Sequence, residues 1–212
     1  MKLFDISLPI SNDLPVWPGD PSVSLIMTNS IVKGDQCNIT RIQIGAHTGT
    51  HIDAPYHFLN DGATVDTIPI ETFIGTCLVV DLDSEVLIEE KDLRKYNLAG
   101  HSRILIKTRN SAMWSNNIRK SFITNYVALG IDAARYLVEI NTILVGIDYL
   151  SIESFQSEGS PVHKLLLRNN ITVLEGLNLS GVKAGKYELI CLPLNLEGCE
   201  GSPARVLLRE AI

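Results

Sequence analysis

The chain has 212 residues with 24 acidic and 18 basic side chains, which gives a formal net charge of −6. Basic residues form no stripe along the sequence, and this argues against nucleic acid as a partner. No apolar run approaches the roughly 20 residues that a membrane-spanning helix needs, and Asp5 precedes any leader-like apolar segment, so we expect a cytoplasmic protein without membrane contact. A chain of this length with 45% hydrophobic residues can bury its own core, and we expect one domain over residues 1–212.

The first eighty residues are rich in β-branched side chains that partly alternate with polar ones. This alternation predicts strands over residues 3–10, 22–31, 38–46 and 76–82. A rigid loop with several prolines follows the first strand and holds Trp17. A tryptophan in such a loop is either a hydrophobic plug or a flat surface on which a ligand stacks, and burial statistics favour the plug.

Three of the five histidines and one carboxylate fall within the eleven residues from His47 to His57. Imidazole nitrogens and carboxylate oxygens are ligand types that suit zinc, manganese and related divalent ions. Gly49 and the threonines beside it disfavour a helix, and full extension would carry the ligands too far apart to reach one ion. We therefore expect the chain to bend at Gly49 and to bring His47, His51, Asp53 and His57 to a metal site.

Helix and strand patterns alternate in the second half of the sequence, which indicates an α/β portion. Amphipathic periodicity predicts helices over residues 89–96 and 130–138, and apolar runs predict strands over 103–107 and 142–148. Trp114 lies in a polar loop, where it is either part of a mobile flap or an interface contact. Composition and periodicity by themselves support only a mixed α and β fold.

Two residues further along the chain are additional candidate ligands. Ser160 and Pro161 form a helix start, with serine as N-cap and proline at the first helical position, which places His163 in the first turn. The helix dipole disfavours an imidazolium there and leaves the ring able to bind metal, although such a histidine is more often an ordinary helix residue. Glu175 ends the apolar strand 171–174, where its carboxylate needs either solvent or a cation.

The segment from His47 to His57 reads H-x-G-T-H-x-D-x-P-x-H and is followed by Asn60-Asp61-Gly62. This pattern resembles the signature of the cyclase-like metal-dependent hydrolase family, in its bacterial kynurenine formamidase (arylformamidase) branch. Four flanking segments resemble the same family in the same order: residues 5–10, 17–20, 187–194 and 201–205.

The resemblance implies a single compact domain of the α+β or mixed α/β class, with the swivelling β/β/α cyclase-like fold, assembled as a homodimer or larger homo-oligomer. It also implies two divalent ions, zinc or manganese, in each subunit. His47, His51 and Asp53 would hold one ion and His163 the other, with Asp53 and Glu175 lying between or bridging them.

The activity that the resemblance implies is metal-assisted hydrolysis of a small aryl amide such as N-formylkynurenine, giving kynurenine and formate. His57 would transfer a proton to the leaving amine, and Trp17 would stack on the aromatic ring. The segment 146–153 departs from the kynurenine formamidase branch, where a proline follows the strand, so another aryl or cyclic amide, isatin-like, is an alternative substrate. A further alternative is a non-catalytic metal-binding protein, whose site would be closed by four protein ligands.

Overall fold

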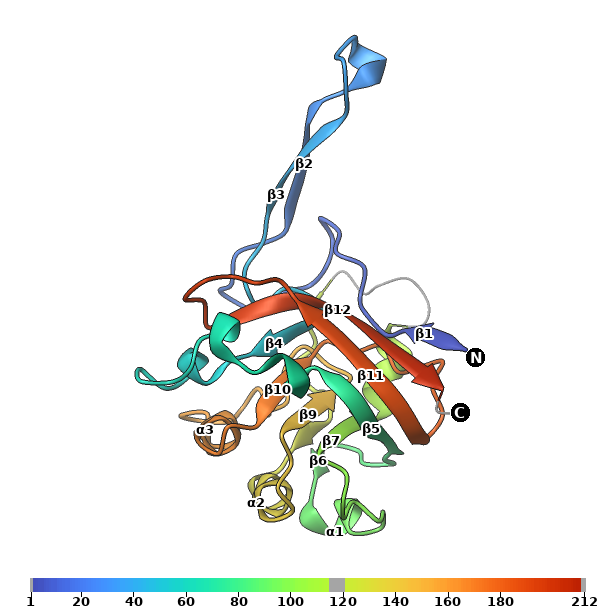
Figure 1. Cartoon of the computed structure of the whole chain (residues 1–212), viewed down its shortest axis with the longest axis vertical. Coiled ribbons are helices and arrows are strands. Elements are labelled where there is room, and N and C mark those ends of the chain that lie inside the picture. Colours follow the sequence, from blue (N-terminus) through green and yellow to red (C-terminus); the bar gives the residue numbers. More distant parts are fainter. Residues whose placement is uncertain (1, 115–120, 211–212) are drawn as a thin grey trace.

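The computed structural model describes residues 2–114 and 121–210, and at its centre lies a sheet that closes on itself (Figure 1). Seven strands follow one another around this ring: β12 (Gly201–Glu210), β11 (Gly185–Pro193), β5 (Ile74–Asp81), β7 (Arg103–Lys107), β9 (Leu144–Ile147), β10 (Thr172–Glu175) and β4 (His51–Asp53). β4 pairs with β10 on one side and with β12 on the other, which completes the ring. β1 (Leu3–Asp5) adds to β12 as an antiparallel neighbour.

The strands β5, β7, β9 and β10 run parallel to one another. The long connections between parallel strands carry the helices α1 (Glu90–Leu93), α2 (Ile131–Glu139) and α3 (Pro161–Arg168), which lie on the outside of the ring (Figure 1). Two short strands in these connections, β6 (Leu87–Ile88) and β8 (Ala128–Leu129), pair with each other. The alternating strands and helices predicted for the second half of the chain are therefore observed.

Side chains alternate between the two faces of the ring because successive residues of a strand point in opposite directions. On β7, Ile104 and Ile106 pack with the helix residues Leu137 and Leu166, whereas Leu105 belongs to a separate cluster. That second cluster fills the ring, because every ring strand contributes to it, through Ile52, Val79, Leu105, Leu144, Leu174, Leu189 and Val206.

An antiparallel hairpin of β2 (Ser24–Asn29) and β3 (Ile39–Gln43) projects far from the ring (Figure 1). The strands predicted over 22–31 and 38–46 are thus present, but they pair with each other and not with the main sheet. Their apolar side chains stay in contact with solvent: Ile26, Met27, Ile31, Val32, Ile39 and Ile42 are all exposed.

Three local predictions differ from the structure. The strand predicted over 3–10 is observed only over Leu3–Asp5, and an isolated bridge between Ser7 and Leu177 follows it. The helix predicted over 89–96 is a single α-turn. Trp114 is neither an exposed flap residue nor a surface contact: it is 6% exposed, and its indole N–H donates to the carbonyl oxygen of Asp148. Residues 115–118 of that loop lie outside the described residues.

The described part of the chain also contains five 3₁₀ turns: η1 (Ile31–Lys33), η2 (Pro55–His57), η3 (Val65–Thr67), η4 (Ile70–Thr72) and η5 (Arg109–Met113). Within residues 2–114 and 121–210, every helix is too short or too polar to cross a membrane.

Candidate metal centre

The residues of the histidine cluster reach the site through a bend that leads into β4. The bend contains Gly49, whose φ of +66° is a conformation that glycine adopts without strain. β4 then runs beside β10 in a register that sets His51 opposite Glu175 and Asp53 opposite Val173. The bend expected from the sequence is observed, and strand pairing brings Glu175 to the histidines.

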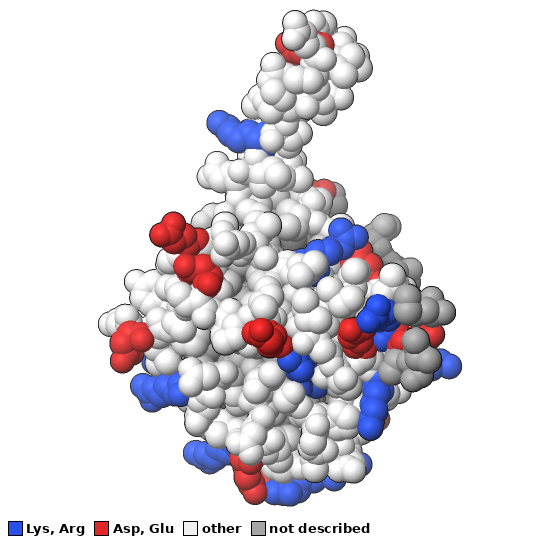
Figure 2. Space-filling view, viewed as in Figure 1, with Lys and Arg blue, Asp and Glu red and all other residues white. Residues whose placement is uncertain are grey.

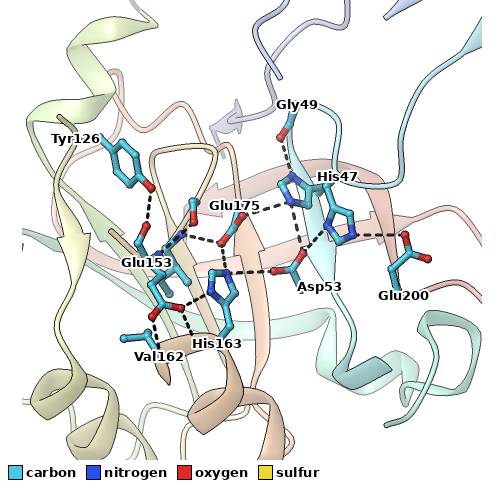
Figure 3. A network of polar contacts seen from close by, with 12 residues as sticks. His47, Gly49, Asp53, Tyr126, Glu153, Val162, His163, Glu175 and Glu200 are labelled. Atoms are coloured by element: carbon cyan, nitrogen blue, oxygen red, sulfur yellow. Dashed lines mark hydrogen bonds and ion pairs between the residues drawn. The ribbon is translucent and has the colours of Figure 1, made fainter. Parts of the chain in front are cut away.

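Asp53 lies at the centre of the cluster and is 1% exposed. Its Oδ1 is 2.8 Å from His47 Nδ1 and 3.5 Å from His51 Nε2. His51 Nε2 also lies 3.3 Å from Glu175 Oε2. His163 Nε2 lies 3.2 Å from Glu175 Oε1 and 3.7 Å from Asp53 Oδ2 (Figure 3). The structure thus brings all five predicted ligands into one buried cluster.

His57 lies at the rim of this cluster, at the end of η2. Its ring stacks on that of His47 with 3.9 Å between centroids, and one of its nitrogens lies within 4.8 Å of ligand atoms of His47 and Asp53. Burial lowers the pKa of His57, which keeps the ring neutral near pH 7. This position suits either a ligand or a proton-transfer residue. The sequence did not point to Glu200, whose Oε1 lies 3.5 Å from His47 Nε2.

Contacts within the cluster outweigh the cost of burying its charges. Burial lowers the pKa of His51, but hydrogen bonds to Asp53 and Glu175 raise it to about 10. Burial likewise lowers the pKa of His163, but its contacts with Glu153 and Glu175 raise it to about 10, so the neutral ring expected at this helix start is wrong for the metal-free protein. Burial raises the pKa of Asp53, yet the histidines hold that pKa well below its usual value. Without a cation, the protons on the two imidazoles therefore keep the carboxylates ionised and close together.

Two atoms of the cluster show that it is suited to a metal ion. Asp53 Oδ2 and His47 Nε2 are buried, and neither has a hydrogen-bond partner among the described residues. A buried oxygen without a partner is costly, and a cation would satisfy it. Two sets of possible ligands share Asp53, namely His47, Asp53 and His57, and His51, Asp53 and Glu175. Nitrogen and oxygen ligands in this arrangement fit a divalent metal ion.

A cavity of about 320 Å³ opens beside the cluster. Trp17 is a half-buried part of its wall, and the ring centroids of Phe122 and Phe155 lie 5.2 Å from that of Trp17. Three residues of the 146–153 segment also line the cavity: Leu150, Ser151 and Glu153. An aromatic wall next to a few polar groups suits a small aromatic ligand.

Glu153 is a site residue that sequence reasoning missed. Its Oε2 lies 2.7 Å from His163 Nδ1, and its carboxylate also accepts the backbone N–H groups of Val162 and His163. Ser160 occupies the predicted N-cap position, but its side chain makes no capping hydrogen bond. Burial raises the pKa of Glu153, while hydrogen bonds from His163, Ser157 and the backbone lower it to about 2. Only the fold brings this loop carboxylate to the helix start.

The fold and the buried histidine–carboxylate cluster are those of a metal-dependent hydrolase of the Cyclase family, and the chain belongs to that family, whose model matches residues 4–154. The chain is 35% identical to the kynurenine formamidase of Bacillus anthracis over 208 residues. This alignment covers 98% of this chain and 97% of that protein. The kynurenine formamidase of Bacillus mycoides (strain KBAB4) is 35% identical over 205 residues, or 97% of this chain and 96% of that protein.

Solved structures share the fold over nearly the whole chain. A potential metal-dependent hydrolase with cyclase activity gives a TM-score of 0.85 at 35% identity and covers 99% of both chains. An isatin hydrolase bound to the product analogue thioisatinate has a TM-score of 0.85, and the alignment covers 98% of this chain and 91% of the isatin hydrolase. The two sequences are 22% identical, so this similarity shows only that the fold is shared. The predicted family and cyclase-like α+β fold are confirmed.

Proposed function

We propose that this protein is a metal-dependent amide hydrolase of the arylformamidase type that converts N-formylkynurenine to kynurenine and formate. The observation that carries the proposal is the position of Asp53, a buried carboxylate with one unpartnered oxygen, shared by two sets of ligands. A cavity with an aromatic wall adjoins the same ligands. The likeness to kynurenine formamidases over nearly the full chain supports the choice of substrate.

In this proposal each subunit holds two divalent ions, zinc or manganese. His47, His51 and Asp53 would hold the first ion, and His163 would hold the second. Asp53 and Glu175 would lie between the two ions or bridge them, since each carboxylate has one oxygen near His51 and the other near His163. Two carboxylates between two cations reduce the repulsion between the cations.

The ions supply, when bound, an acidified water and a positive charge that polarises the substrate carbonyl. His57, neutral and at the rim of the cluster, accepts a proton from the attacking water and passes it to the leaving amine. Trp17 stacks on the aromatic ring, since its indole lines the cavity that reaches the cluster. In the metal-free protein the surrounding histidines lower the pKa of both carboxyls, which leaves Asp53 and Glu175 ionised and ready to bind a cation.

The test is turnover of N-formylkynurenine by protein stripped of metal and refilled separately with zinc and with manganese, followed through the absorbance of the released aromatic amine. We expect turnover that depends on added metal. A fully loaded protein that leaves this substrate intact would reject it, and isatin and other cyclic or aryl amides would then be assayed under the same conditions.

A non-catalytic metal protein is the competing interpretation. A structural ion is enclosed by four protein ligands, whereas a catalytic ion keeps a position open to solvent or substrate. The adjoining cavity of about 320 Å³, lined by His47, His51, His57, His163 and Glu175, supports the open arrangement. A loaded protein inactive on every aryl and cyclic amide tested would favour the non-catalytic interpretation.

We also propose that the protein is a homo-oligomer, a dimer or tetramer, in the cytoplasm. The projecting hairpin is mostly uncharged (Figure 2), and an isolated two-stranded hairpin is only marginally stable in water. An apolar groove of about 760 Å³ lies at its root and includes Leu25, Ile42, Leu192 and Leu194. A second copy of the chain is the natural partner, since a two-fold arrangement would bury the hairpin of each copy against the groove of the other.

A further inference from the structure

Glu153 makes an unusually complete set of contacts for a loop carboxylate. The residue is 4% exposed and lies in the connection between β9 and α3. Its Oε1 accepts the hydroxyl of Ser157 at 2.7 Å and the backbone N–H of Val162 at 3.0 Å. Its Oε2 lies 3.1 Å from the backbone nitrogen of His163 and 2.7 Å from Nδ1 of the same residue (Figure 3). Both oxygens are therefore engaged, and one of them contacts both the backbone and the ring of His163.

These contacts fix the orientation of the His163 imidazole. An ionised carboxylate only accepts hydrogen bonds, so the ring must carry its proton on Nδ1 to satisfy Glu153 Oε2. The opposite nitrogen, Nε2, then points to Glu175 Oε1 at 3.2 Å and to Asp53 Oδ2 at 3.7 Å. When Nε2 of His163 loses its proton, its lone pair is directed toward the space between the carboxylates of Glu175 and Asp53.

The carboxylate of Glu153 also caps the N-terminus of α3, the helix that carries His163. Ser160 has a φ of +53° and makes no side-chain capping bond, which leaves the first backbone N–H groups of α3 without the usual partner. Glu153 accepts two of them, at Val162 and His163. The backbone and the ring of His163 are thus held by one group, which leaves the side chain little freedom to rotate.

We propose that Glu153 is a positioning residue for the metal centre: it holds His163 as the tautomer protonated on Nδ1, with Nε2 directed toward Asp53 and Glu175, where a divalent ion would bind. The inference rests on the proposed function only in assuming that a divalent ion binds there. A carboxylate that orients a ligating histidine typically changes metal affinity by about 10- to 100-fold when it is removed.

The test compares wild-type protein with Glu153→Gln and with Ser157→Ala. An amide at position 153 sets its NH₂ group either against the backbone N–H of Val162 or against the backbone N–H and Nδ1 of His163. The helix then loses one capping bond, or the required tautomer loses its acceptor. The Ser157 variant is the matched control, because it removes a hydrogen bond to Oε1 and leaves the contact between Oε2 and Nδ1 intact. Affinity is measured by titrating metal-free protein with Zn²⁺ alone in competition with a chromophoric chelator.

We expect Glu153→Gln to weaken Zn²⁺ binding by about 10- to 100-fold and Ser157→Ala to change it by less than about twofold. Nitrogen-15 NMR of the histidines provides the second readout, with the His163 signals identified by their loss in His163→Asn. Zn²⁺-loaded wild-type protein should show a protonated, hydrogen-bonded Nδ1 and a metal-bound Nε2 at His163, and the glutamine variant should lose the Nδ1 signature.

A variant that melts at a lower temperature but keeps the wild-type Zn²⁺ affinity and the Nδ1 proton would show that Glu153 only caps the helix, and would overturn the inference. If the glutamine variant does not fold, the wild-type spectrum still decides: coordination of His163 through Nδ1, or a missing Nδ1 proton, is incompatible with the proposal. Wild-type protein that binds no Zn²⁺ would overturn the proposed metal centre itself, which is a different result from equal affinity in the two proteins.

Discussion

At the scale of single residues, His57 differs from the other histidines of the cluster. His51 and His163 are almost fully buried between carboxylates, whereas His57 is half-buried at the rim and has a pKa lowered by burial. A neutral imidazole beside the cavity is suited to proton transfer near pH 7.

Replacement of His57 by alanine should therefore lower turnover by about 10²- to 10⁴-fold, which is the usual contribution of a general acid–base group, and should leave the metal content unchanged. His101→Ala is the matched control, because this histidine lies in the loop before β7 and does not line the cavity. Turnover and metal content are measured on the same samples. Near-wild-type turnover would refute proton transfer by His57, and loss of metal would identify it as a ligand.

At the scale of elements, the site depends on the close approach of two turns, one before β4 and one after β10. Gly176 has a φ of +69°, and a Cβ at that position would lie 2.1 Å from the carbonyl oxygen of Gly49. Only glycine allows the two backbones to approach this closely. The approach sustains the β4–β10 pairing that places His51 opposite Glu175.

Gly176→Ala should therefore destabilise the protein by at least about 2 kcal/mol, through backbone strain and the contact with Gly49, and should weaken metal binding. Gly181→Ala is the matched control, since nothing lies within 4 Å of a Cβ there, and its effect should stay within about 0.5 kcal/mol. Chemical denaturation of the metal-free proteins gives the two free energies of unfolding. Equal values would mean that the turns can separate without loss of structure.

At the scale of the whole molecule, metal binding is coupled to protonation. Contacts with carboxylates raise the pKa values of His51 and His163 from 6.5 to about 10 in the folded protein. This stabilisation is complete below pH 6.5, the value for the unfolded chain, and is lost as the pH rises through about 10. The melting temperature of metal-free protein should fall across that range.

Because the metal ions must displace these protons, binding should release about two protons per subunit near pH 7, and metal affinity should rise with pH. Calorimetric titration in buffers of different ionisation enthalpy counts the protons directly. Binding without proton release would show that both imidazoles are already neutral in the metal-free protein.

The apolar side chains of the projecting hairpin lead to a prediction about the formation of the homo-oligomer. Leu25 pairs with Ile42, and Met27 lies on the same face, whereas Arg41 lies on the opposite face. The double variant Met27→Ser with Ile42→Ser should raise the concentration needed for oligomer formation at least about tenfold, since each buried apolar side chain contributes about 1.5–3 kcal/mol. Arg41→Ser should change it little. Analytical ultracentrifugation over a range of concentrations measures both, and a wild-type protein that stays monomeric throughout would refute the interface.

Local sequence was enough to predict the features that depend on neighbouring residues. The spacing from His47 to His57, with Gly49 between, predicted both the ligand types and the observed bend, because flexibility at glycine and ligand chemistry are local properties. The strand over residues 103–107 was predicted to the residue, because its apolar run is bounded by polar residues. The distinctive histidine pattern also sufficed to indicate the family.

Features that depend on contacts between distant segments of the chain were decided by the tertiary structure. The register of β4 against β10 sets His51 opposite Glu175, and a loop fold brings Glu153 to His163. Trp114 packs into a hydrophobic cluster, and its indole N–H donates to the carbonyl oxygen of Asp148, the residue that follows β9. The sequence by itself determined which side chains could bind a metal and where the chain bends. Which of these side chains lie close together was decided only by the closure of seven strands into a ring, because the pairing of the strands depends on the packing of the whole core.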